Sequence, residues 1–169
     1  MKQKSEQETY LTVAALCAQA EHCQWEMLEK MRRWELSEEQ QAHVMQRLLE
    51  ERYVDDERYA RAFIKDKIRY NRWGRRKVEQ ALWQKHIAED IRLRALDEVD
   101  DEEYLSVLRP LLKQKQQELK KSKGQGTRGK EQGARGMEEA LLNQKLIRFA
   151  LGRGFTYDLI RQCVDDVED

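Results

Sequence analysis

The clearest chemical pattern in the sequence is a basic run at residues 58–77, which holds nine Lys or Arg side chains and one acid, Asp66. Positions 58, 61, 65, 69 and 72 advance by three or four residues, so on a helix they fall on one face. A row of cations suits phosphate groups or an acidic protein surface. We therefore take as candidate DNA- or partner-binding residues Arg58, Arg61, Lys65, Arg69, Arg72, Arg75, Arg76 and Lys77. The alternative is a solvated helix face whose cations pair with Asp55, Asp56 and Glu57.

A second basic segment, Lys120–Gly136, contains five of the eight glycines and six cations against Glu131. Its cations are Lys120, Lys121, Lys123, Arg128, Lys130 and Arg135. This composition predicts a flexible basic insertion at about residues 115–137, without a core of its own. Such a segment either contacts nucleic acid or serves only to keep the protein in solution.

The remaining polar residues do not form a catalytic pattern. The pairs Asp55-Asp56 and Asp100-Asp101 stand where helices begin, and there acids cap the backbone and complement the helix dipole. The three histidines lack the spacing of a metal site, and the sequence contains no P-loop, GxSxG, HExxH or GxGxxG motif. The four tryptophans could stack on bases, although aromatic residues at helix ends more often pack between helices. We expect no enzymatic activity, metal or cofactor.

The composition excludes several classes of protein. Charged residues make up 38% and hydrophobic residues 40%, with one proline, which favours helices. The three cysteines are scattered, as in a cytoplasmic protein with reduced thiols. No apolar stretch is long enough to span a membrane, and residues 1–9 do not resemble a signal peptide. We expect a cytoplasmic monomer whose net charge is zero but unevenly distributed.

The elements that must position the basic run are short amphipathic helices. Apolar residues recur at helical spacing in residues 10–20, 23–34, 55–70, 75–85, 88–99, 138–151 and 156–167. Ser37-Glu38-Glu39-Gln40 has the pattern of a capping box at the start of another helix. Pro110 predicts a kink or restart. Gly152 and Gly154 suit a turn with positive φ.

The helices follow an internal repeat. Residues 23–36 align without a gap with residues 74–87, and again with 142–155. Three sets of apolar positions coincide: Met27/Val78/Leu146, Met31/Leu82/Ala150 and Leu36/Ile87/Phe155. We expect an all-α protein of three tandem three-helix repeats in an elongated curved array. Its parts would be a polar tail at 1–9, repeats at 10–53, 54–99 and 100–169, and the insertion within the third repeat.

The residues also resemble a known family. The phrase YVDDERYAR at 53–61, followed by Trp73-Gly74 and Lys85-His86-Ile87, is similar to the signature of the RecX family. Residues 20–23, Ala-Glu-His-Cys, resemble the Arg-Glu-His-Ser of that family. The chain departs from it at Glu35 and His86, where glycine is common, and at Cys23, where serine is usual. If those turns need positive φ, each non-glycine residue costs roughly 1 kcal/mol.

This resemblance implies three three-helix repeats, no enzymatic activity, and regulation of the RecA recombinase. We therefore expect a protein that binds RecA–DNA filaments and inhibits their recombinase, ATPase and co-protease activities in DNA repair and the SOS response. We also expect weak, salt-dependent contact with single- or double-stranded DNA. Two alternatives remain, a helical-repeat nucleic-acid-binding module and a protein-binding adaptor, neither of which acts on RecA.

Overall fold

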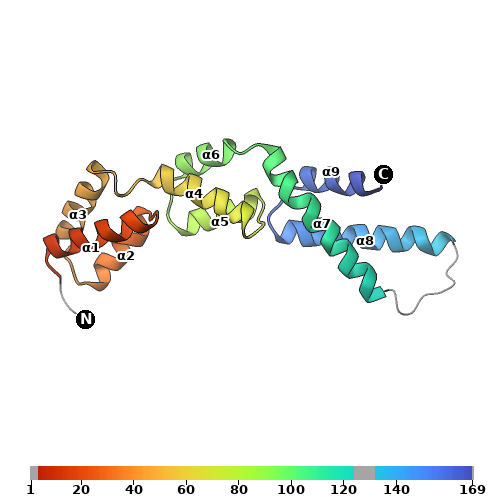
Figure 1. Ribbon diagram of the computed structural model, residues 1–169, viewed down its shortest axis with the longest axis horizontal. Coiled ribbons are helices and arrows are strands. Elements are labelled where there is room, and N and C mark those ends of the chain that lie inside the picture. The colour runs from red at the N-terminus through yellow and green to blue at the C-terminus, as the bar shows by residue number, and fades with distance from the viewer. Residues whose placement is uncertain (1–3, 124–131, 169) are drawn as a thin grey trace. The chain divides into compact units, whose positions relative to one another are not determined.

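The computed structural model describes residues 4–123 and 132–168, and these residues form nine α-helices and no strand (Figure 1). The helices are α1 Glu6–Gln19, α2 Gln24–Arg33, α3 Glu38–Glu50, α4 Asp56–Arg69, α5 Arg75–Gln84, α6 Glu89–Asp97, α7 Asp101–Lys123, α8 Gln132–Gly152 and α9 Tyr157–Glu168. The all-α prediction is confirmed. In chain order the helices make three successive sets of three.

Contacts divide the protein into two compact units. Unit 1 comprises Met1–Lys65 and Gln80–Glu98, and unit 2 comprises Asp66–Glu79 and Val99–Asp169. In unit 1, α1 and α2 both pack on α3 around a buried core. In unit 2, α7, α8 and α9 pack on one another (Figure 1). The middle set of helices therefore contributes to both units.

The second helix of each set ends in the same backbone turn. One residue takes a positive φ, and the N–H of the next residue donates to the carbonyl five positions earlier. The pairs are Leu36 to Met31 at 3.3 Å, Ile87 to Leu82 at 3.2 Å and Phe155 to Ala150 at 3.2 Å. All six residues are buried. These bonds are those of the Schellman motif, whose apolar contact requires hydrophobic residues at these positions. The repeated apolar positions in the sequence thus correspond to the same helix-ending turn in each set.

The residues with positive φ in these turns are Glu35 at 60°, His86 at 57° and Gly154 at 92°. The two departures from glycine therefore do lie in left-handed backbone.

We expect Glu35→Gly to raise the free energy of unfolding by about 0.5–1 kcal/mol, because glycine adopts this conformation without strain. Urea denaturation followed by circular dichroism measures the change. Arg33→Gly, two residues earlier in helical backbone, should instead lower stability by up to about 1 kcal/mol. Equal effects of the two variants would contradict this account.

The starts of α2 and α5 each pack on the turn that ends the second helix of the next set. In unit 2, the N–H groups of Gly74 and Arg76 donate to the carbonyls of Arg153 at 2.8 Å and Gly154 at 3.0 Å. In unit 1 the equivalent contacts join Cys23 Sγ to the Lys85 carbonyl at 3.8 Å and stack Trp25 on His86, with ring centroids 5.0 Å apart. The beginning of α5 is thereby held in unit 2 and its end in unit 1, which explains why the middle set is divided.

Three local expectations need correction. Residues 6–9 belong to α1 rather than to a polar tail, because the Ser5 side chain caps the helix by accepting from the Glu8 N–H at 3.2 Å. Of the kink or restart expected at Pro110, the restart is wrong, because helix α7 continues through this residue. Gly152 is helical, and of the pair only Gly154 takes a positive φ. The predicted capping box is confirmed, since Ser37 and Gln40 exchange hydrogen bonds at 3.1 and 3.0 Å.

Candidate nucleic-acid interface

Helix α4 positions the first half of the basic run. The Asp55 carboxylate accepts a hydrogen bond from the Arg58 N–H at 3.1 Å and so caps the helix start. Ala60, Ile64 and Ile68 are buried along one face. The cations at positions 58, 61, 65 and 69 follow one another at intervals of three or four residues and lie beside this apolar face, as the sequence predicts.

Two of these cations are held by carboxylates of unit 1. Arg58 donates from Nε to Glu21 at 2.6 Å and from a terminal nitrogen to the carbonyls of Arg52 and Tyr53. Arg61 forms a two-pronged pair with Glu98 at 3.0 and 3.1 Å, and these bonds raise the pKa of Arg61 above its ordinary value. Both partners lie 37 residues away in sequence. Arg58 and Arg61 thus have structural partners that the sequence does not reveal.

Four other cations of the basic run are exposed. They are Lys65, Arg69, Arg72 and Arg76. None of the four forms an ion pair with a carboxylate in the part of the chain that the structure describes. Their guanidinium and ammonium groups are therefore hydrated and available to phosphate oxygens or to acidic side chains.

The last three cations of the run begin helix α5, whose first turn contains no acid. Positive side chains at a helix N-terminus are unfavourable by themselves. Here, however, the end of α8 supplies carbonyls to the start of α5, so the negative end of the α8 dipole lies beside these cations. Lys77 also stands over the Trp73 ring at 4.8 Å. Arg75, Arg76 and Lys77 therefore have a local electrostatic reason to be basic. Of the three, Arg76 is exposed, while Arg75 and Lys77 are half-buried.

Tyr70 is an exposed aromatic residue within the basic run, and it was not among the candidates from the sequence. Its side chain is 73% exposed and directly follows Arg69 at the end of α4. Aromatic rings among cations are typical of surfaces that stack single-stranded bases. The interleaving of Tyr70 with Arg69 and Arg72 is the signal that would have identified it.

Of the tryptophans, Trp83 is 64% exposed, while Trp25 and Trp73 have partners.

The second basic segment differs from the prediction where it is described. Residues 115–123 continue α7 and residues 132–137 belong to α8, so these parts are helical rather than a flexible loop. For residues 115–123 the reason is that Lys, Gln, Glu and Leu all favour helices even without a core to pack against. Lys120 and Lys121 are exposed on α7, Lys123 ends that helix, and Arg135 is near the start of α8. Arg128 and Lys130 lie outside the described residues.

The acidic and sulfur groups serve structural purposes in unit 1. The Asp56 carboxylate accepts from the Gln24 N–H at 2.9 Å and from the Gln24 side chain at 3.2 Å, which caps α2. Burial raises the pKa of Asp56, while those hydrogen bonds act in the opposite direction. Burial also raises the pKa of the Cys23 thiol to about 12, which makes it unreactive near neutral pH.

Residues 4–123 and 132–168 contain neither a cluster of metal ligands nor a membrane-spanning helix. No group of three or more potential metal ligands comes together there. None of the helices in these ranges has the length and apolar character required to cross a membrane.

Sequence comparison relates the chain to one family. Residues 55–96 match the family described as RecX, second three-helix domain. Regulatory protein RecX of Lactobacillus gasseri is 38% identical over 81 residues, which are 48% of this chain and 30% of the relative. Regulatory protein RecX of Clostridium perfringens is 33% identical over 117 residues, or 69% of this chain and 48% of the relative. The matching part of the chain thus spans less than half the length of these relatives.

Structural comparison gives the same fold. The crystal structure of RecX from Lactobacillus salivarius superposes with a TM-score of 0.78 over 96% of each chain, at 16% sequence identity. A second crystal structure, of a regulatory protein RecX, gives a TM-score of 0.77 over 95% of this chain and 73% of the other, at 18% identity.

Proposed function

The chain belongs to the RecX family, and from this premise we propose that it binds RecA–DNA filaments and inhibits their recombinase, ATPase and co-protease activities. The protein acts by binding and performs no chemistry of its own. It works in DNA repair and the SOS response. DNA contact is weak and salt-dependent, because it rests on charge.

One observation carries the proposal. Lys65, Arg69, Arg72 and Arg76 are exposed and have no ion pair with a described carboxylate, whereas Arg58 and Arg61 are paired. A folded protein with zero net charge that leaves several cations of one run unpaired keeps them available to an external anion. Tyr70 adds an aromatic surface beside them. DNA phosphate and the acidic surface of a filament protein are both suitable anions.

The mechanism that follows is occlusion. Cations that hold DNA phosphate or a RecA surface place the helical repeats where a second DNA strand or a repressor would bind. Each retained phosphate contact releases counterions, so affinity falls as salt rises. Four contacts with single-stranded DNA correspond to a slope of about −3 in log affinity against log salt concentration.

The test is hydrolysis of ATP by RecA on single-stranded DNA, titrated with this protein at fixed salt. We expect hydrolysis to fall to a small fraction of its starting rate, and DNA binding measured in parallel to show the slope given above. Steeply salt-dependent DNA binding without any effect on RecA would favour the alternative of a general nucleic-acid-binding module. Inhibition without detectable DNA binding at low salt would mean that the cations contact RecA itself. No effect on RecA and no DNA binding would leave the protein-binding adaptor.

A further inference from the structure

A small cavity in unit 2 brings together cations from three elements that are far apart in the sequence. Its volume is ≈ 280 Å³, and its lining residues are Arg72, Leu111, Gln114, Lys115, Glu118, Phe149 and Arg153. Arg72 comes from the turn between α4 and α5, Lys115 from α7, and Arg153 from the turn after α8. This volume is slightly below the range of about 300–1,000 Å³ typical of sites for drug-sized ligands, so the cavity suits a small group.

The charges of the cavity are not balanced by its own residues. Three cations face one carboxylate, that of Glu118, and the Glu118 contact with Lys115 Nζ is long, at 4.0 Å. Arg72 forms no ion pair with any acid that the structure describes. Three like charges lining one small space repel one another, and an anion bound among them would remove that repulsion.

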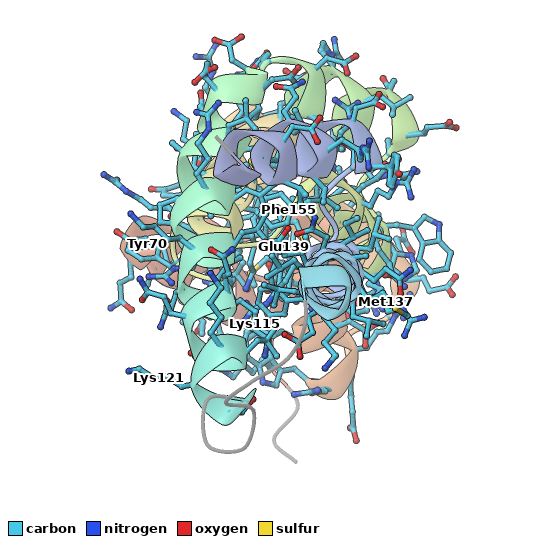
Figure 2. All side chains as sticks on the ribbon, turned by 90° about the vertical axis from the view of Figure 1, so that its right-hand side faces the viewer. Tyr70, Lys115, Lys121, Met137, Glu139 and Phe155 are labelled. Atoms are coloured by element: carbon cyan, nitrogen blue, oxygen red, sulfur yellow. The ribbon has the colours of Figure 1, made fainter. Side chains whose placement is uncertain are left out.

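Two of the three cations, Lys115 and Arg153, are held in place by specific contacts. Arg153 donates to the Asn71 carbonyl at 3.0 Å, which ties the turn carrying Arg72 to the end of α8. The Phe149 ring lies beneath both Lys115 Nζ, 5.0 Å from its centroid, and the Arg153 guanidinium, at 5.4 Å. Figure 2, which looks along α8, shows Lys115 between α7 and α8. Lys115 and Arg153 are therefore positioned before any ligand is bound, which reduces the entropy lost on binding.

The backbone at Arg72 is also unusual. Its φ is 56°, in the left-handed region that glycine adopts most easily. Glu35, Arg52 and His86 also take a positive φ, in turns that end helices. Arg72 likewise follows the end of α4, where the Trp73 N–H donates to the Lys67 carbonyl at 3.1 Å. Strained conformations of this kind are frequent at binding sites. At this position, arginine supplies a planar donor that glycine would lack.

We propose that the cavity lined by Arg72, Lys115 and Arg153 binds a phosphate group of single-stranded DNA. Two arginines with planar, forked donors and one lysine match the tetrahedral oxygens of a phosphate. This inference rests on the proposed function, in that DNA supplies the phosphate. It adds Lys115 and Arg153, which lie outside the basic run, and makes the phosphate contact a defined site in place of a diffuse surface.

The experiment measures binding of the full chain to a fluorescent oligothymidylate by anisotropy over a range of salt concentrations. We expect Arg72→Gln, Lys115→Gln and Arg153→Gln each to weaken binding by about tenfold and to reduce the salt slope by about one unit or slightly less. Glu118→Gln should tighten binding, because it removes the single acid from the described lining. Lys113→Gln and Arg148→Gln are matched controls, exposed on α7 and α8 but outside the cavity, and should change affinity less than threefold. Thermal melting of each variant checks that it folds.

Three outcomes overturn the inference: cavity variants that behave like the controls, Glu118→Gln without effect on affinity, or no binding of the oligothymidylate at low salt. The first two would leave the proposed function standing if the wild-type protein still inhibits RecA. Conversely, if DNA binding depends on the cavity but the protein does not affect RecA, the proposed function is refuted and the assignment of the cavity as a phosphate site stands. Inorganic phosphate at constant ionic strength distinguishes the source of the anion. Weak competition, at millimolar concentration only, supports a DNA phosphate, and tight binding of free phosphate would assign the cavity to that ion instead.

Discussion

Replacing Arg69 and Arg76 together with glutamate should weaken binding to single-stranded DNA by about 100-fold and abolish the inhibition of RecA that we propose. Each lost charge-assisted contact with phosphate is worth about 1.5 kcal/mol or more, and two such contacts correspond to about a factor of 100. Both side chains are exposed and have no ion pair with a described acid. Their replacement therefore disturbs little of the fold. Anisotropy and RecA ATPase assays at matched salt measure the two effects.

A matched control separates position from total charge. The variant Arg33→Glu with Lys145→Glu changes the net charge by the same amount, at exposed sites on α2 and α8 outside the basic run. It should bind DNA within about threefold of the wild type, since isolated surface charges contribute little at physiological salt. If both double variants lose the same affinity, binding depends on overall charge and the assignment to the basic run is wrong.

Gly74→Ala should lower the stability of unit 2 by about 3 kcal/mol or more, a larger effect than most single substitutions cause. A Cβ atom on Gly74 would overlap the backbone nitrogen and Cα of Phe155 and the carbonyl carbon of Gly154. Backbone atoms cannot move aside as flexible side chains do, so the start of α5 must separate from the turn after α8. That separation breaks the hydrogen bond from the Gly74 N–H to the Arg153 carbonyl at 2.8 Å.

Gly152→Ala is the control for this substitution. Gly152 lies at the end of α8, and a Cβ there would meet no atom within 4 Å. Alanine is the better helix former, so this variant should keep or raise stability, by up to about 1 kcal/mol. Thermal and urea unfolding compare the two directly. A Gly74→Ala protein that melts with the wild type would show that α5 does not depend on its contact with α8.

The local elements follow from short stretches of sequence. The helices α4, α5, α6 and α9 begin and end within about two residues of the predicted bounds, because apolar spacing and caps act over one or two turns. The aligned positions Met31, Leu82 and Ala150 were recognisable as a repeat before their common role in Schellman turns was known. The family resemblance, rather than local patterning, singled out Glu35 and His86 as positions where glycine is common, and both have a positive φ.

The predictions from sequence fail where neighbouring residues favour two different structures about equally. The glycines and lysines of residues 120–136 indicate a loop, yet the Lys- and Gln-rich stretch before them has high helix propensity, and α7 extends to Lys123. Pro110 predicts a kink or a restart, and the restart is wrong. The helix continues because packing of Leu108, Leu111 and Leu112 in unit 2 offsets the lost hydrogen bond.

The sequence by itself determined the all-α class, the threefold repeat of helix ends and the excess of cations at residues 58–77, because propensity, periodicity and charge are properties of neighbouring residues. Only the tertiary structure decided which of those cations are paired. Arg58 and Arg61 are paired by Glu21 and Glu98, each 37 residues away. Arg72, in contrast, faces a cavity that it shares with Lys115 and Arg153. Ion pairs and cavities depend on distances between residues that packing brings together, and no local pattern encodes those distances.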